Sequence, residues 1–358
     1  MDHADRKIAP DMPEMRSVRI GAPVAMPPRS LLRSAPTTTK SATTPLRTIA
    51  TSTAEWKPSN IPSLPQMYPL ERSHARVKND TSAVAQRIAS VLRQQSLAPV
   101  FEDQKASGET QCHVRFVVRL FVDGDDLVVE VQRRSGCCFV FHQVSKALLQ
   151  AARGETVMAL PAFVVPNSMI KEEQQRAACD EALELANELL LKDRIDAQVL
   201  GMQSLVHMTR EGGCKHSASA ILKGPVMDTL LKFVRLSKGI DDEFLVGHRT
   251  NMRGDAFHVL ANCLAREASK MSFDKFASDQ VLKSVIDELR VAAEKPHNAC
   301  HAARVLASLV KNSEAIKLRA EQLDAPAAII MAFNEGISRH AMLEEEAKAL
   351  KREMANCM

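Results

Sequence analysis

The sequence predicts a multidomain chain with a disordered N-terminal tail, a small α+β domain and an all-α array of helical repeats. Eleven of the 17 prolines precede residue 70. Alternating apolar residues over 112–132 indicate paired strands, and from residue 171 onward most segments have the 3.6-residue periodicity of amphipathic helices. An apolar content of 45% is sufficient for packed cores in the second and third parts.

Residues 1–79 are predicted to be a disordered tail, because their Pro, Ser, Thr and Arg content buries too little apolar surface to offset chain ordering. Between Glu14 and Glu55 there are six basic residues and no acidic one, as in an organelle transit peptide. Transit peptides avoid acids, however, and four acids stand at the start: Asp2, Asp5, Asp11 and Glu14. A phosphorylatable, weakly basic linker is therefore favoured over a transit peptide.

Residues 80–154 are predicted to form the α+β domain. Ser82 can cap a helix whose apolar residues recur at i, i+4, i+7 and i+8. Two strands, Cys112–Val122 and Leu127–Gln132, are joined by an acidic turn that contains Gly124, which indicates an antiparallel hairpin. A second helix follows, so the order is helix, strands, helix.

This domain resembles the kinase-associated-1 domain in the sequence Arg134-Ser135-Gly136, in Phe139 and Phe141, and in a helix expected to begin near His142. Cys137 departs from the family pattern, which usually has an acid there. The resemblance implies an aromatic-containing strand before the helix. It also implies that the domain binds acidic phospholipid heads or makes an autoinhibitory contact.

The candidate lipid contacts in this domain are four arginines: Arg115, Arg119, Arg133 and Arg134. Only weak binding to anionic lipid is expected, because residues 96–154 contain seven basic and seven acidic side chains. A domain used only for protein contacts is an equal alternative. The chain lacks the glycine-rich loop, the His-Arg-Asp and the Asp-Phe-Gly of a kinase.

Residues 155–170 are expected to connect this domain to helical repeats over 171–358. Leu205, Leu260 and Leu306 each follow a small residue by four positions and precede an apolar one by three. These copies lie 55 and 46 residues apart, and the longer interval contains a polar insertion at 237–246. Without the insertion the period is close to the 40–47 residues of armadillo and HEAT arrays.

The repeats resemble the armadillo family in Val199-Leu-Gly-Met-Gln-Ser-Leu205, in Ile221-Leu-Lys-Gly-Pro225 and in Ala302-Ala-Arg-Val-Leu306-Ala-Ser-Leu309. The resemblance implies an armadillo-like solenoid whose leucine-containing helices line a concave face that holds an extended peptide. The candidate groove residues stand two positions before and after each leucine: Gln203, His207, His258, Asn262, Arg304 and Ser308. Asn262 matches the family's groove asparagine. Gln203, His258 and Arg304 stand in place of the tryptophans of nuclear-import members, so the expected peptide is acidic or mixed. A merely solvated helix face is the alternative interpretation of these residues.

Motifs of nucleotide, acyl-transfer and metal chemistry are missing from the sequence, so no catalytic residue, metal or cofactor is expected. The most tempting metal or nucleophile cluster is Cys214, His216, Cys300 and His301. Cys300 and His301 would point about 100° apart on a helix, which favours a structural role. The eight cysteines include no C-x-x-C pair, so free thiols in the cytoplasm are expected, with the nucleus also open.

A non-enzymatic scaffold or adaptor that binds a protein partner on the solenoid is therefore the first functional hypothesis. A membrane-recruited regulator that binds acidic phospholipid through the α+β domain is the alternative. Nucleic-acid binding is not expected, because the basic excess lies in the tail and the only Trp and Tyr also lie there.

Overall fold

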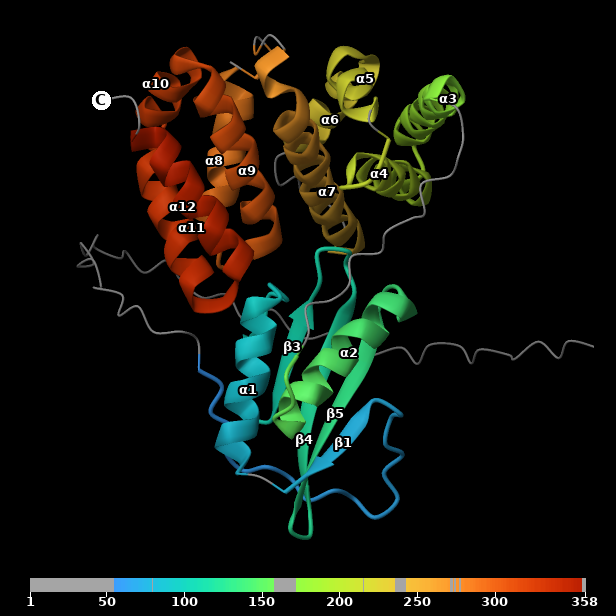
Figure 1. Cartoon of the computed structure of the whole chain (residues 1–358), viewed down its shortest axis with the longest axis vertical. Helices are drawn as coiled ribbons and strands as arrows, with labels where there is room; N and C mark the ends of the chain where they lie inside the picture. Colours follow the sequence, from blue (N-terminus) through green and yellow to red (C-terminus); the bar gives the residue numbers. More distant parts are fainter. Residues whose placement is uncertain are drawn as a thin grey trace, which may run out of the picture. The chain divides into compact units, whose positions relative to one another are not determined.

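A computed structural model describes residues 55–78, 80–157, 172–214, 216–235, 243–270, 273, 275–276 and 278–355. In these residues a small antiparallel sheet domain is followed by a mostly helical region, which confirms the coarse order predicted from the sequence (Figure 1). Residues 1–54 of the predicted tail, and 158–170 of the expected connector, lie outside the described ranges. None of the described helices has both the length and the apolar character to cross a membrane.

The sheet has five strands in the order β1-β5-β4-β3-β2, with every neighbouring pair antiparallel. Their bounds are β1 (His74–Val77), β2 (Val100–Phe101), β3 (Lys105–Glu109), β4 (Arg115–Asp123) and β5 (Asp126–Ser135). The predicted hairpin is β4–β5, and Asp123 pairs with Asp126 across a tight turn. Gly124 supplies the left-handed backbone of that turn, with φ of 61°.

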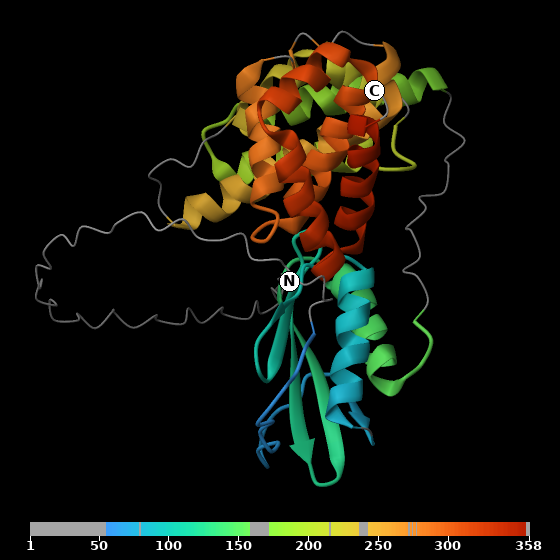
Figure 2. The ribbon, with the colours of Figure 1, turned by 90° about the vertical axis from the view of Figure 1, so that its left-hand side faces the viewer.

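Helices α1 (Thr81–Gln94) and α2 (Cys138–Arg153) cover one face of this sheet (Figures 1 and 2). Phe116, Val118 and Leu120 of β4 point into the core beneath them, as the alternation predicts. The expected cap at Ser82 is wrong, because Asp80 accepts the hydrogen bond from the amide of Ala83.

The predicted aromatic strand before the second helix does not form. Gly136 ends β5 with φ of 92°, and its Cα lies so close to Val114 that a Cβ would come within 2.7 Å of that residue's Cα. The chain therefore turns sharply and enters α2 at once. Phe139 lies in the first turn of that helix with 79% of its surface exposed, and Phe141 packs at the edge of the core.

The prediction that the tail extends to residue 79 is wrong for residues 55–77. Trp56 is only 2% exposed, and its indole nitrogen donates to the carbonyl of Glu102 at 3.0 Å. The Tyr68 hydroxyl donates to the buried carboxylate of Glu130 at 3.0 Å, and β1 adds a strand beside β5. Two large aromatic rings therefore order a segment whose proline content alone favours disorder.

The helical region contains eleven α-helical and 3-10 segments in the described residues: α3 (Glu172–Leu190), α4 (Ile195–Thr209), α5 (Ser217–Lys223), α6 (Pro225–Arg235), α7 (Glu243–Glu267), η1 (Ala268–Lys270), α8 (Asp279–Arg290), α9 (Pro296–Asn312), α10 (Glu314–Gln322), α11 (Ala325–Arg339) and α12 (Ala341–Ala355). Helices α4, α7, α9 and α12 contact one another in that order, and α6, α8 and α11 form a second row against them. Residues 237–242 of the expected insertion lie outside the described ranges, and its last four residues, 243–246, belong to α7.

Two separate hydrophobic cores result from this arrangement. One lies between the sheet and helices α1 and α2, and the other runs through the helical region. The three aligned leucines, Leu205, Leu260 and Leu306, are at most 1% exposed in the second core. Their neighbours two positions away are therefore left near the surface of α4, α7 and α9.

Candidate functional site

The six groove candidates lie on three helices that are neighbours in space, α4, α7 and α9. Gln203 and His207 of α4 are exposed. The other four, His258, Asn262, Arg304 and Ser308, are only partly exposed. The Arg304 guanidinium lies 3.5 Å from the carboxylate of Glu346 on α12. The six candidates thus lie on adjacent helices, and the side chains of Gln203 and His207 are more exposed to solvent than the other four.

Helix α7 presents one polar face through residues spaced three and four apart, Asp255, His258 and Asn262. The His258 ring stacks on that of His301 from α9, with ring centroids 4.1 Å apart. The amide nitrogen of Asn262 is buried and has no hydrogen-bond partner in the described part of the chain. An unpaired buried amide is rare in native proteins, so Asn262 has donor capacity available for a ligand.

The same face of α7 already holds a segment of the sheet domain. In the turn between β3 and β4, the His113 ring lies 2.9 Å from the carboxylate of Asp255 and 3.4 Å from that of Glu109. Burial lowers the pKa of His113, but its hydrogen bonds to Asp255 and Glu109 outweigh burial and raise the pKa to about 9. The ring is therefore positively charged at neutral pH.

A chain of hydrogen bonds continues from this turn through two further histidines, His297 of α9 and His340, which follows α11. The amide of Leu343 donates to Nδ1 of His340 at 3.1 Å. Nε2 of His340 lies 2.9 Å from Nδ1 of His297. Nε2 of His297 lies 2.9 Å from the main-chain carbonyl of Glu109 in β3. We call His297 and His340 the histidine pair.

Further hydrogen bonds join the sheet domain to helices α11 and α12. Arg93 of α1 donates to the carbonyl of Ile337 at 2.7 Å and forms an ion pair with Glu344. The Ser96 hydroxyl accepts from the amide of Met342 at 2.9 Å. Arg339 also donates a hydrogen bond to the carbonyl of Pro99. We call the whole set of interactions between the sheet domain and the helices the domain contact, and it includes the hydrogen bonds of His113 and of the histidine pair.

Several residues of the domain contact have strained backbone conformations. Five non-glycine residues in the described ranges have left-handed φ values, and three of them lie in its segments: Ser96 (54°), Ala98 (43°) and His113 (58°). Such conformations are unfavourable for residues with a Cβ and persist only where surrounding contacts hold them. These conformations are held by local hydrogen bonds, such as those from Leu97 to Leu92 and from His113 to Thr110, in addition to the domain contact.

Burial lowers the pKa of each remaining histidine at this place. The pKa of His258 falls to about 4. Burial also lowers the pKa values of His297, His301 and His340. Arg304 adds to this effect at His301 and Arg339 at His340, whereas Glu109 opposes it at His297. Four neutral imidazoles thus lie in this part of the structure, and two of them, His258 and His297, are close enough to the charged His113 to be affected by its charge.

The four lipid candidates are divided between two faces of the sheet. Arg133 pairs across the strands with the core residue Phe116, so it lies on the helix-covered face, and it donates to the carbonyl of Gly136 at 2.7 Å. Arg119 pairs with Lys105 and lies on the opposite face. On that face Arg115 is bonded to Glu109, and Arg134 to Gln132. The arginines do not form one cluster.

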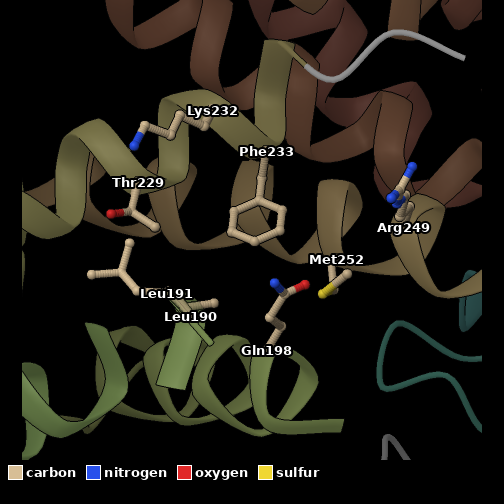
Figure 3. Close-up of a pocket in the computed structure, with 8 residues that line it drawn as sticks. All are labelled: Leu190, Leu191, Gln198, Thr229, Lys232, Phe233, Arg249 and Met252. Atoms are coloured by element: carbon tan, nitrogen blue, oxygen red, sulfur yellow. The ribbon is translucent and has the colours of Figure 1, made fainter. Parts of the chain in front are cut away.

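A separate pocket of about 260 Å³ lies between α3, α4, α6 and α7 (Figure 3). The Phe233 ring points into it above Gln198 and Met252, and Lys232 and Arg249 stand at its two sides. It contains none of the predicted site residues. Its lining combines apolar side chains with the hydroxyl of Thr229 and two cations.

The cysteine and histidine cluster considered for zinc is split by the fold. The free thiols of Cys214 and of Cys179 in α3 share a hydrogen bond, and burial together with this hydrogen bond raises the pKa of Cys179 to about 12. Cys300 is fully buried in α9, and His301 stacks on His258 instead. In the part of the chain that the structure describes, no three His, Cys, Asp or Glu side chains gather as a metal site would require.

Sequence reasoning missed Asp255, His113, His297 and His340. A signal was present in the helical spacing of Asp255 to His258 and of His297 to His301, each of which places two polar side chains on one face. Comparison of the sequence with protein-family models, with curated proteins and with solved structures finds no significant match. The function is therefore inferred from the residues and contacts described above.

Proposed function

We propose that this protein is a non-enzymatic adaptor that binds an extended segment of a partner protein along the outer face of α4, α7 and α9. The row of leucine-containing helices is the arrangement expected of an armadillo-like solenoid, whose groove lies along such a row. We also propose that the sheet domain is related to the kinase-associated-1 domain, which it resembles in sequence.

The observation that supports this proposal best is the way the helices hold the chain's own β3. A side chain of α9, His297, lies at hydrogen-bond distance from the main-chain carbonyl of Glu109, and Asp255 of α7 binds the adjacent turn. In a peptide-binding groove, side chains of neighbouring helices bind the backbone of an extended peptide and its flanking side chains in the same way.

Asn262 and Arg304 extend this polar surface along α7 and α9 away from Asp255 and His297. Asn262 is partly exposed as a residue, and its unpaired amide nitrogen can donate to a peptide carbonyl once the side chain turns outward. Arg304 is partly neutralised by Glu346 and can exchange that carboxylate for an acidic side chain of the partner. The partner segment is accordingly expected to be extended and acidic or mixed in charge.

The test compares proteins retained by the full chain and by the double variant Asn262→Ala with Arg304→Gln. Lys283→Gln is the matched control, because it removes an exposed charge from α8 in the other row of helices. A partner that the double variant loses and the control keeps, at unchanged melting temperature, supports the groove. A partner that binds all three proteins equally refutes it.

A second candidate function, recruitment to acidic phospholipid, is favoured by one observation. Arg119 and Lys105 are cross-strand neighbours on the sheet face that α1 and α2 leave uncovered. Binding is expected to be weak, because Arg115 and Arg134 on this face are already paired. Arg119→Glu should abolish sedimentation with anionic liposomes, and Arg133→Glu, on the covered face, should not. Equal effects of both substitutions would place the lipid contact elsewhere.

A further inference from the structure

We propose that the domain contact is a proton-released clamp, in which protonation of the histidine pair below neutral pH detaches the β3–β4 turn from helices α7 and α9. This inference depends only on the domain contact and does not require the proposed adaptor function.

The hydrogen bonds of the histidine pair fix both rings in the neutral state. A main-chain amide can only donate, so Nδ1 of His340 must be unprotonated to accept from Leu343. The proton of His340 is then on Nε2 and is donated to Nδ1 of His297. His297 carries its proton on Nε2 and donates it to the carbonyl of Glu109. This assignment of tautomers is the one that satisfies all four ring nitrogens.

An added proton breaks this chain wherever it binds. On Nδ1 of His340 it meets the amide hydrogen of Leu343. On Nδ1 of His297 it meets the hydrogen on Nε2 of His340. Either event replaces an attractive hydrogen bond by two donors that face each other within a buried site, and the ring must turn away. Because His297 bonds directly to β3, its reorientation removes one of the anchors of the turn.

Burial outweighs the compensation that the surroundings of the pair offer an imidazolium: the carbonyl and the charge of Glu109 raise the pKa of His297, but burial lowers it by more. Glu109 of β3 is engaged by His113 and Arg115, and Asp255 of α7 by His113. On α12, Glu344 pairs with Arg93 and Glu346 with Arg304. The cations that act on the pair are His113, beside His297, and Arg339, beside His340, while Arg304 acts on the neighbouring neutral rings His258 and His301.

The sign of the pH effect follows from burial, which lowers the pKa values of both rings below the ordinary 6.5. A group with a lowered pKa stabilises the closed state fully above 6.5, and this contribution is lost as the pH falls below 6.5 toward the lowered value. At pH 5.0, about 1.5 pH units lower, each ring weakens the contact by up to about thirtyfold. The partly exposed ion pairs of Arg93 and His113 persist at this pH and oppose release.

The experiment measures hydrogen–deuterium exchange of the full chain at pH 7.5 and 5.0, with labelling times scaled for the intrinsic exchange rate. Peptides covering residues 105–115 and 340–346 should lose at least about tenfold protection at pH 5.0, while α8 should keep its protection. His297→Gln should reduce this pH dependence, because glutamine does not titrate. His142→Gln, an exposed histidine of α2, is the control and should behave like the wild type.

Two outcomes would overturn the proposal. One is equal protection of the wild-type turn at both pH values, and the other is a loss of protection that includes α8 to the same degree, which would indicate general acid unfolding. His297→Arg places a permanent charge at the pair and should release the turn at pH 7.5. Because a substitution can disturb packing, imidazole nitrogen resonances of the wild type are titrated as well. A pKa of 6.5 or above for both rings of the pair would contradict the clamp.

Discussion

Replacing Asp255 by Asn should lower the pKa of His113 and weaken the domain contact. In the native chain that pKa rises from 6.5 to about 9, with the hydrogen bond to Asp255 as the largest favourable cause. Asparagine keeps the shape and one acceptor but removes the charge. Since an adjacent opposite charge shifts a pKa by about 1–3 pH units, and Glu109 remains in place, a fall of about 1–2 pH units is expected.

The raised pKa also sets how the domain contact depends on alkaline pH. One pH unit corresponds to about 1.4 kcal/mol, so the rise from 6.5 to about 9 corresponds to about 3 kcal/mol in favour of the charged ring. This stabilisation is fully present below 6.5 and is lost as the pH rises through about 9. Because 26% of the side chain is exposed, solvent screening reduces the loss between pH 7 and 10 to about 1–2 kcal/mol.

The assay is an NMR titration of the His113 ring from pH 6 to 10.5 in the wild type and in Asp255→Asn. Exchange protection of the β3–β4 turn is followed in parallel at pH 7 and 10, with His113→Gln as the variant that cannot titrate. A wild-type His113 that titrates near 6.5, or a turn whose protection changes with pH equally in wild type and His113→Gln, would refute the reasoning.

Two further predictions concern packing and thiol chemistry. Gly336→Ala should destabilise the chain by about 1–3 kcal/mol in thermal or urea unfolding, because a Cβ there would come within 2.4 Å of a main-chain nitrogen of α12. Gly247→Ala, where the added Cβ meets nothing within 4 Å, should instead stabilise α7 by up to about 1 kcal/mol, and destabilisation of both variants alike would contradict this account. Main-chain amides at the start of α2 lower the pKa of the exposed Cys137 thiol, whereas burial raises that of Cys300 to about 12. Mass spectrometry after brief iodoacetamide treatment at pH 7 should therefore find Cys137 alkylated well before Cys300, and comparable rates would be inconsistent with these environments.

The parts of the fold that could be predicted from the sequence are those with a local signal. The alternation in β4 and the turn at Gly124 predict the hairpin, and the repeated leucines predict the row of helices. Strand β3 could not be predicted, because Lys105–Glu109 has no apolar alternation and is held in place by pairing with β4.

For the candidate site, only the positions of residues within each single helix could be predicted from the sequence. Leucine spacing places His258, Asn262 and Arg304 on neighbouring helices. The hydrogen bonds of the histidine pair, by contrast, join residues that are 43 and 188 positions apart in the sequence. Contacts between residues so far apart in the sequence depend on how the folded elements pack together. The spacing of residues within one helix does not indicate such contacts.

The separation of the two hydrophobic cores has a consequence for how heat unfolds this chain. Each core buries its own apolar side chains, and the domain contact between them consists mainly of hydrogen bonds and ion pairs. We therefore expect the sheet domain and the helices to unfold as two cooperative units that are coupled by the free energy of a polar contact. A calorimetric scan should show a single broad endotherm at pH 7.5 that splits into two at pH 5.0, so one melting temperature does not describe this molecule at every pH.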